Sequence, residues 1–450
     1  MNDLSELAEG VLGRAGDGEA MEVYASTGTE VEIKVFDGRV ENLARAESGG
    51  VGIRILRESG AGARVGVAWT GSLDERAIDR ALSEARDNAR FASEDEFLAF
   101  ARPDGVAAAP LELIDPSVHS MSLDDKVALA VETERIVRGA DRIRQVESAD
   151  YSDFDLQTVV ASTYGVHARS QRTGSFLSVE AIAADASGDQ TGWGFQAGRG
   201  PAMLEAQRVA TDAISRATRL LGAVKPTSMR TTAVFSPRSA ATLLAIIGSA
   251  LSGDAVVRGR SIFAGRVDTD VASRAVSVID DPTDPRQFAA SRYDGEGLAC
   301  RRNILIDHGR LSGFVYDTVA ARRAGVSSTG SAVRGGLAGP PSAGCRALSF
   351  VAGAQGADEI VQLVGDGVYV DALSGVHSGV NPISGDFSVG FTGFMIRGGQ
   401  LAEPLREATV ASTLQRILLD VVAVGSDVEW LPGSAAGQTI AVTGVSVGGR

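Results

Sequence analysis

Short runs of alternating polar and apolar residues, separated by glycine-bearing turns, dominate the first 70 residues of the chain. The runs cover 23–26, 31–36, 52–56 and 65–69, with turns expected at 37–38, 48–50 and 59–62. Period-two patterning at hairpin spacing predicts an antiparallel meander. Glycine supplies 54 of the 450 residues without a collagen-like repeat, which agrees with a fold rich in tight β hairpins.

Helices are predicted around and after this meander. Apolar stripes of helical period are expected at 3–14, 73–92, from Ser122 to just before Gly139, and at 201–221. For the second of these, Ser72 is the expected N-cap and Glu75 completes a capping box. Strands are expected to resume over 142–196 in a layout like that of the first meander, which is compatible with an internal duplication.

A polar, proline-containing stretch at 224–228 predicts a domain boundary. It separates an N-terminal domain with β meanders, 1–224, from a C-terminal domain, 229–450. Strands and helices show no long alternation of the βαβ kind, so a doubly wound parallel sheet is disfavoured. The expected fold class is α+β, with two domains, antiparallel sheets, packed helices and glycine-rich β hairpins.

Charge and hydropathy exclude several classes of protein. The chain has 43 lysines and arginines against 57 acidic residues, a formal net charge of −14, which disfavours nucleic acid as a partner. No run of 18 apolar residues is present and the N-terminus lacks a signal-peptide core, so a cytoplasmic protein without a membrane span is expected. Cys300 and Cys345 are too few for a disulfide framework.

Local motifs for metal or nucleophilic chemistry are weak. The four histidines have no helical spacing and no His-Glu-x-x-His string occurs. His308 is expected at a hairpin tip, and His377 lies in a glycine- and serine-rich loop. The G-x-S-x-G string at 444–448 leaves no room for the helix that a nucleophile elbow needs.

One helix is unusually apolar. Ser236 is a good N-cap, Pro237 suits the first helical position, and the helix over residues 240–251 is interpreted as apolar on all sides. Such a helix is expected to be buried.

Several strings, taken together, resemble the TldD/PmbA metallopeptidases, once called modulators of DNA gyrase. They are Leu251-Ser-Gly-Asp254 with Arg258-Gly-Arg-Ser261, Tyr293-Asp-Gly-Glu-Gly297, Ala320-Ala-Arg-Arg-Ala-Gly325, Ile383-Ser-Gly-Asp-Phe-Ser388 and Val424-Gly-Ser-Asp-Val-Glu429. Their order and spacing agree along essentially the whole chain. The resemblance implies a C-terminal domain that is a degenerate form of the metallopeptidase domain.

The zinc-binding branch of that family carries His-Glu-x-x-x-His on the helix before the Gly-Asp string, plus a late cysteine. Alignment on that string puts Leu244, Ala245 and Ser249 at the three helical positions, and no cysteine occurs near 432–434. None of these side chains is a zinc ligand, and a catalytic site needs about three. The resemblance therefore implies the PmbA branch, also called TldE, with no metal and no catalytic residue in this chain.

A chain of this branch is expected to act with a TldD-type subunit that carries the zinc, on unfolded or leader peptides, although a homodimer of the isolated chain is compatible with the sequence. The candidate peptide-channel or interface residues are Arg258, Arg260, His377, Ser378, Gly379, Ser384 and Asp386. Two alternatives stay open. One is a stand-alone peptidase with a rearranged metal site that recruits His377 and Asp386. The other is a peptide-binding module with no hydrolytic partner.

Overall fold

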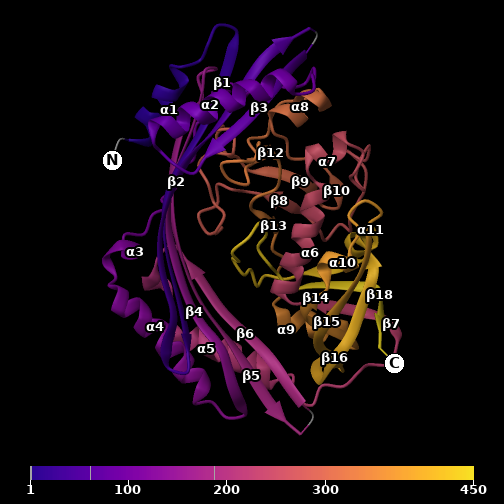
Figure 1. Ribbon diagram of the computed structural model, residues 1–450. Coiled ribbons are helices and arrows are strands. Elements are labelled where there is room, and N and C mark those ends of the chain that lie inside the picture. The colour runs from indigo at the N-terminus through magenta and orange to yellow at the C-terminus, as the bar shows by residue number, and fades with distance from the viewer. Residues whose placement is uncertain (1–2, 61, 187, 450) are drawn as a thin grey trace.

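The N-terminal half forms one strongly curved sheet (Figure 1). The computed structural model describes residues 3–60, 62–186 and 188–449. Six antiparallel strands lie in the order β3-β2-β1-β4-β5-β6: β1 Glu19–Phe36, β2 Arg39–Ser59, β3 Gly62–Thr70, β4 Ile143–Ser162, β5 His167–Asp185 and β6 Gly188–Gly198. With 18 to 21 residues, β1, β2, β4 and β5 are far longer than the usual three to ten.

The sheet consists of two similar halves. Each half is a helix, three antiparallel strands and a closing helix, and the halves join through β1 and β4. The helices are α1 Leu4–Leu12 and α2 Glu75–Phe91 in the first half, α4 Leu123–Arg138 and α5 Ala206–Thr218 in the second, with the short α3 Ser117–Ser120 and the 3-10 turn Pro201–Met203 between. Two separate apolar cores lie under these helices. The arrangement fits the duplication that the sequence suggested.

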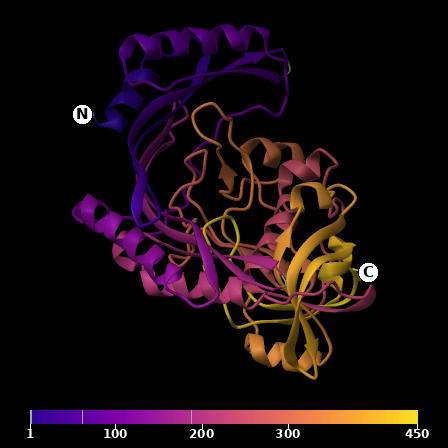
Figure 2. The ribbon, with the colours of Figure 1, turned by 60° about the horizontal axis from the view of Figure 1, so that its bottom comes forward.

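The C-terminal half of the chain occupies the concave side of this sheet. The helices of the N-terminal half cover the convex side (Figures 1 and 2). The main sheet of the C-terminal half has the order β16-β15-β14-β7-β18-β17, and a further β16–β18 pairing closes five of the strands into a ring. The strands are β7 Met229–Phe235, β14 Gly367–Ser374, β15 Asp386–Arg397, β16 Gln400–Thr413, β17 Val421–Val424 and β18 Ile440–Gly448. All pairs are antiparallel except β14–β7. An α+β fold with mainly antiparallel sheets is thus confirmed.

Smaller elements complete this half. The helices are α6 Pro237–Ala250, α7 Gly253–Val257, α8 Thr318–Ala324, α9 Ala357–Val364, α10 Val376–Gly379 and α11 Leu414–Leu419. A second sheet contains β8 Val278–Asp280, β9 Asn303–Asp307, β10 Arg310–Leu311 and β13 Leu348–Phe350, and a two-stranded ladder pairs β11 Ala332–Val333 with β12 Ser342–Ala343. Among the described residues, the helices are too short or too polar to cross a bilayer.

Some local predictions were wrong. The predicted strands 23–26 and 31–36 are parts of the single strand β1, and the predicted turn at 48–50 lies inside β2. Its glycines serve close packing, because a Cβ on Gly50 or Gly52 would overlap Leu337. The N-cap of α2 is Asp74, whose carboxylate accepts the backbone N–H groups of Arg76 and Ala77. Ala61 of the predicted turn 59–62 lies outside the described residues.

In each half of the curved sheet, a glycine lies directly under the closing helix, α2 or α5. Replacing these glycines tests how closely each helix packs on its strand. A Cβ on Gly66 of β3 would overlap the backbone of α2 at Ala85 and Ala89, and one on Gly192 of β6 would overlap α5 at Ala213 and Ala217. We expect Gly66→Val and Gly192→Val each to destabilise the protein by about 2–3 kcal/mol, because the helix must move off its sheet. Urea unfolding measures this loss.

The matched control is Gly10→Ala in α1. A Cβ there meets no heavy atom within 4 Å, so the change should be neutral or stabilising by up to about 1 kcal/mol. Wild-type stability in Gly66→Val or Gly192→Val would contradict the close packing of helix on strand.

Candidate functional site

Helix α6 carries the three positions at which the zinc-binding relatives were expected to have ligands. Its N-cap, Ser236, accepts the backbone N–H of Ser239, as the sequence predicted. Leu244 is fully buried in the C-terminal core, Ala245 is half-buried, and Ser249 is exposed and donates its hydroxyl to the carbonyl of Ile246. The helix is therefore not buried on all sides, which corrects the prediction.

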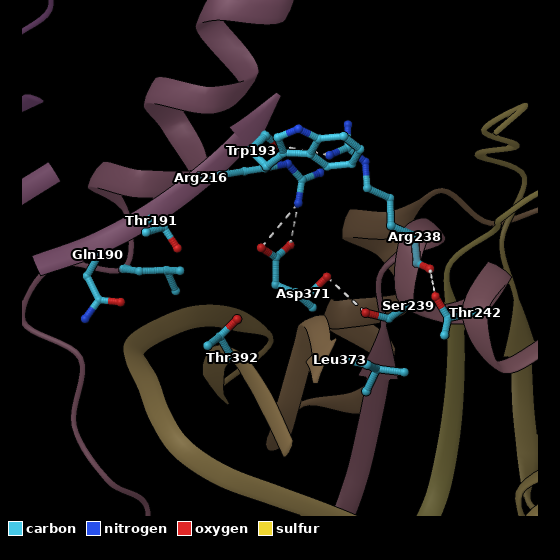
Figure 3. Close-up of a pocket in the computed structure, with 13 residues that line it drawn as sticks. Gln190, Thr191, Trp193, Arg216, Arg238, Ser239, Thr242, Asp371, Leu373 and Thr392 are labelled. Carbon is cyan, nitrogen blue, oxygen red and sulfur yellow. Dashed lines mark hydrogen bonds and ion pairs between the residues drawn. The ribbon is translucent and has the colours of Figure 1, made fainter. Parts of the chain in front are cut away.

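The open face of α6 leads into a cleft of about 360 Å³ (Figure 3). Thr242, Ala245 and Ser249 form one stripe along this face, since their spacing of three and four residues brings them above one another. Thr242 of α6 lines the cleft, together with further residues of α6, residues of β6, α5, β14 and β15, and Leu220 just after α5. They are Gln190, Thr191, Gly192, Trp193, Arg216, Leu220, Arg238, Ser239, Asp371, Ala372, Leu373 and Thr392. The cleft lies at the junction between the curved sheet and the C-terminal ring.

Asp371 is the electrostatic centre of the cleft. Its carboxylate, which is 3% exposed, lies 3.4 Å from Arg216 and forms a second ion pair with Arg219. Arg216 also pairs with Asp212 at 2.8 Å, and Asp212 pairs with Arg238 at 2.6 Å. This network ties α5 of the first half to α6 and β14 of the second. Each of these charged side chains has an ion-pair partner. The network is therefore better suited to holding the two halves of the chain together than to transferring protons.

Sequence reasoning missed Asp371 for a geometrical reason. Strand β14 alternates, and Val370 is already buried, so the next residue would normally point outward. A register shift between Val370 and Ala372 turns the Asp371 side chain inward. A charged residue directly after an apolar strand run was the one signal that could have drawn attention to it.

An aromatic wall borders the same cleft. Trp193 is half exposed, and its ring stacks on Phe195 with centroids 4.5 Å apart. The guanidinium of Arg238 lies 4.4 Å from the centre of the Phe195 ring. Exposed tryptophan beside hydroxyl groups offers both apolar contact and hydrogen bonding. The cleft therefore combines an exposed aromatic side chain with a network of paired charges.

The segment 374–386, which carries five of the candidate channel residues, lies largely on the surface. His377 and Ser378 belong to the four-residue α10 and are exposed, and Ser384 donates to the Asp386 carboxylate at 2.7 Å. A Cβ on Gly379 would overlap the carbonyl of Ser388, so this glycine is required for packing. The cleft of Figure 3 is lined by residues just before this segment but by none of 374–386. A channel role for the segment stays a prediction.

The two predicted arginines belong to another part of the domain. Arg258 follows α7 and pairs with Asp254 at 2.7 Å, while Arg260 is exposed two residues later. Among the described residues, no hydrogen bond or ion pair joins either arginine to His377 or Asp386. The seven candidate residues therefore do not form one hydrogen-bonded site.

The side chains around α6 determine whether this helix could take part in a metal site. Cys345 lies against this helix, with its Sγ 3.6 Å from the carbonyl of Gly248, and burial raises the pKa of its thiol well above the usual range. The segment 432–434 runs nearby, because the carbonyl of Ser434 accepts the N–H of Leu348, which packs on Gly248. Over 3–60, 62–186 and 188–449, no three His, Cys, Asp or Glu side chains lie together as a metal site would require.

The string Tyr293-Asp-Gly-Glu-Gly297 forms a buried acidic turn under the curved sheet. Asp294 accepts backbone N–H groups from Glu296, Leu298 and Ala332. Glu296 accepts both the N–H and the hydroxyl of Thr318. Burial raises the pKa of Glu296 to about 8, and the neighbouring carboxyls act in the same direction. Glu296 is therefore mostly protonated at neutral pH.

This protonation makes stability depend on pH. The ordinary pKa of the Glu296 carboxyl is 4.5 and the folded value is about 8, so the folded state binds the extra proton between these values. Stability should therefore fall as the pH rises from about 5 to about 8. Glu296→Gln keeps the shape without the charge. We expect it to be more stable than wild type at about pH 9 and similar at about pH 5, measured by urea unfolding.

Glu6→Gln, an exposed change on α1, is the control and should leave the pH profile as in wild type. If Glu296→Gln and wild type lose stability in parallel across this range, the buried Glu296 is not the group that responds.

Family models match this chain in three segments, two in the half that forms the curved sheet and one in the C-terminal half. Family models described as PmbA/TldA metallopeptidase domain 1, central domain and C-terminal domain match residues 21–89, 116–221 and 228–449. The metalloprotease PmbA of Escherichia coli O157:H7 is 27% identical over 425 residues, which cover 92% of this chain and 89% of that protein. A metalloprotease of Methanothermobacter thermautotrophicus is 25% identical over 91% of this chain and 88% of its own.

Solved structures share the fold. A crystal structure described as a modulator of a DNA gyrase from Thermotoga maritima has a TM-score of 0.89 at 22% identity, covering 99% of this chain and 100% of that one. TldE from Thermococcus kodakarensis has a TM-score of 0.88 at 21% identity, covering 99% of both chains. The matched domains span most of the residues in the expected order. This chain belongs to the PmbA/TldD metallopeptidase family.

Proposed function

We propose that this chain is the metal-free, TldE-type subunit of a two-component zinc peptidase that cleaves unfolded or leader peptides. The zinc and the catalytic groups would come from a TldD-type partner. The observation that carries the proposal is the chemistry of α6. The three expected ligand positions hold Leu244, Ala245 and Ser249, and the first of them is part of the apolar core.

The names of the relatives are compatible with this division of labour. A stretch of 184 residues is 30% identical to a protein named metalloprotease TldD homolog from Buchnera aphidicola, whereas the metalloprotease PmbA of Escherichia coli matches over nearly the full length. The stand-alone alternative would need a ligand set elsewhere. His377 and Asp386 are both exposed, and no third ligand lies with them among the described residues.

The decisive assay uses a flexible peptide and three samples: this chain, its TldD-type partner, and both together. We expect chelator-sensitive cleavage in the mixture at a rate well above that of either protein alone, and no stoichiometric zinc in this chain by elemental analysis. His377→Ala and Asp386→Asn, both on the exposed segment, should lower the rate of the mixture without affecting folding if this segment contacts peptide or partner.

Other outcomes separate the alternatives. About one zinc per chain, with cleavage by this chain alone, would establish the stand-alone peptidase. Peptide binding by this chain without any effect on the partner would favour the binding module and refute the subunit role.

Restoring the ligands should not restore an enzyme. In Leu244→His/Ala245→Glu/Ser249→His, the first and last positions are five residues apart and differ by about 140° in direction on an ideal helix. Position 244 faces the core and position 249 faces outward. We expect weak or no zinc binding and a stability loss of about 2–5 kcal/mol, mainly from the buried leucine. Calorimetric zinc titration and urea unfolding measure both.

Ser249→His alone is the control and should keep wild-type stability, since that side chain is exposed. A triple variant with stoichiometric zinc and chelator-sensitive cleavage would show that the catalytic frame persists in this chain.

A further inference from the structure

A second cavity, of about 340 Å³, lies between the concave face of the curved sheet and the C-terminal half. Its floor comes from β1, β4 and β5, and its roof from the acidic turn and the loop after β11. The lining residues that bear on its chemistry are Tyr24, Arg172, Asp294, Arg334 and Arg346. Its volume is within the range of small-ligand sites, roughly 300–1,000 Å³.

The charges that line this cavity are unbalanced. Arg172, Arg334 and Arg346 contribute three positive groups, and Asp294 contributes the one carboxylate. Asp294 already accepts three backbone N–H groups. Arg334 is committed as well, since it pairs with the buried Glu22 at 2.5 Å and donates to the carbonyl of Gly295.

Arg172 and Arg346 are different, because neither has an ion-pair partner among the described residues. The Arg172 guanidinium lies 5.5 Å from the centre of the Phe154 ring, and Arg346 makes one long hydrogen bond of 3.4 Å to the carbonyl of Ala332. Burial lowers the pKa of Arg172, and the charge of Arg346 lowers it further, so the two cations repel each other. Burial raises the pKa of the nearby Asp280 and Asp294 carboxyls and the charge of Arg346 acts in the opposite direction, although neither carboxyl lies within ion-pair distance of it. The two half-buried guanidiniums thus keep N–H donors that a bound anion could use.

The Tyr24 phenol lies among these cations. Burial raises its pKa, while Arg334, Arg172 and Arg346 each act in the opposite direction. The phenol therefore stays protonated at neutral pH, and its hydroxyl donates no hydrogen bond to any described residue. The Tyr24 hydroxyl can supply a neutral hydrogen-bond donor beside the guanidinium groups of Arg172 and Arg346. A planar guanidinium matches the geometry of a carboxylate, because it can donate two parallel N–H···O hydrogen bonds to it.

We propose that this cavity binds the carboxylate of a peptide through Arg172 and Arg346, with the Tyr24 hydroxyl as a further donor. Anion binding follows from the cavity and its unpaired cations, whereas the choice of a peptide rests on the proposed function. The carboxylate belongs either to a peptide C-terminus or to an acidic side chain. In both cases this chain selects peptides by charge while the partner supplies the cleavage.

Isothermal titration calorimetry on this chain alone tests the proposal with three acetylated tripeptides. The first is Ala-Ala-Ala with a free C-terminus, the second is its C-terminal amide, and the third is Ala-Glu-Ala amide. We expect one or both carboxylate peptides to bind at least about tenfold more tightly than the neutral amide, as charged hydrogen bonds should give. A preference for the first identifies the C-terminus, and a preference for the third identifies an acidic side chain.

Arg172→Gln and Arg346→Gln should each weaken carboxylate binding about tenfold or more, and Tyr24→Phe by several-fold. Without ligand, Arg172→Gln should melt at the same temperature as wild type or higher, because it removes a repulsion. A purely structural arginine would give the opposite result. Arg169→Gln is the matched control on the same strand, since Arg169 is exposed and pairs with Asp3 at 3.0 Å.

Equal affinity for all three peptides, or no saturable binding, would overturn the proposal, as would unchanged binding in Arg172→Gln. If Arg172→Gln failed to fold, Arg346→Gln and Tyr24→Phe would decide the question. Because these measurements use the isolated chain, they do not depend on whether a TldD-type partner exists. Failure of the subunit role and failure of this site therefore give different results.

Discussion

A buried carboxylate, Glu22, joins the two halves of the molecule. It is 2% exposed on the concave face of the curved sheet, and it pairs with Arg54 of β2 and with Arg334 from the C-terminal half. Burial by itself would raise the pKa of this carboxyl, but the two arginines outweigh burial and lower it. The charge is costly to desolvate unless both partners are in place, so the C-terminal half has one favourable position on the sheet.

Both clefts depend on that position. The first lies where α5 and β6 meet α6 and β14, and the second lies where β1, β4 and β5 face the acidic turn. In the first cleft, all the acidic and arginine side chains around Asp371 are paired with one another. Their ion pairs connect the two halves of the chain. In the second cleft, Arg172 and Arg346 lack ion-pair partners among the described residues. That difference in pairing, rather than cleft size, distinguishes a structural junction from a binding site.

Much of the local structure could be predicted from the sequence because it depends on neighbours along the chain. The Ser236 cap of α6 and the turn at His308 are local, and both occur where the sequence places them. The long strands could not be predicted, because Gly49 and Gly50 indicate a turn unless one knows that another segment approaches them. Leu337 approaches Gly50 from nearly 300 residues further along the chain, and Leu73 packs beside Gly49.

Residue identity and order are enough to indicate the family, the α+β class and the side chains at the three positions of α6 that align with the zinc-binding string. The direction in which those side chains face depends on tertiary packing. Leu244 is buried and Ser249 is exposed because α6 packs one face on the C-terminal core. Tertiary structure also brought Tyr24, Arg172 and Arg346 to one cavity. These residues are far apart in sequence, and only the docking of the C-terminal half into the concave sheet makes them neighbours.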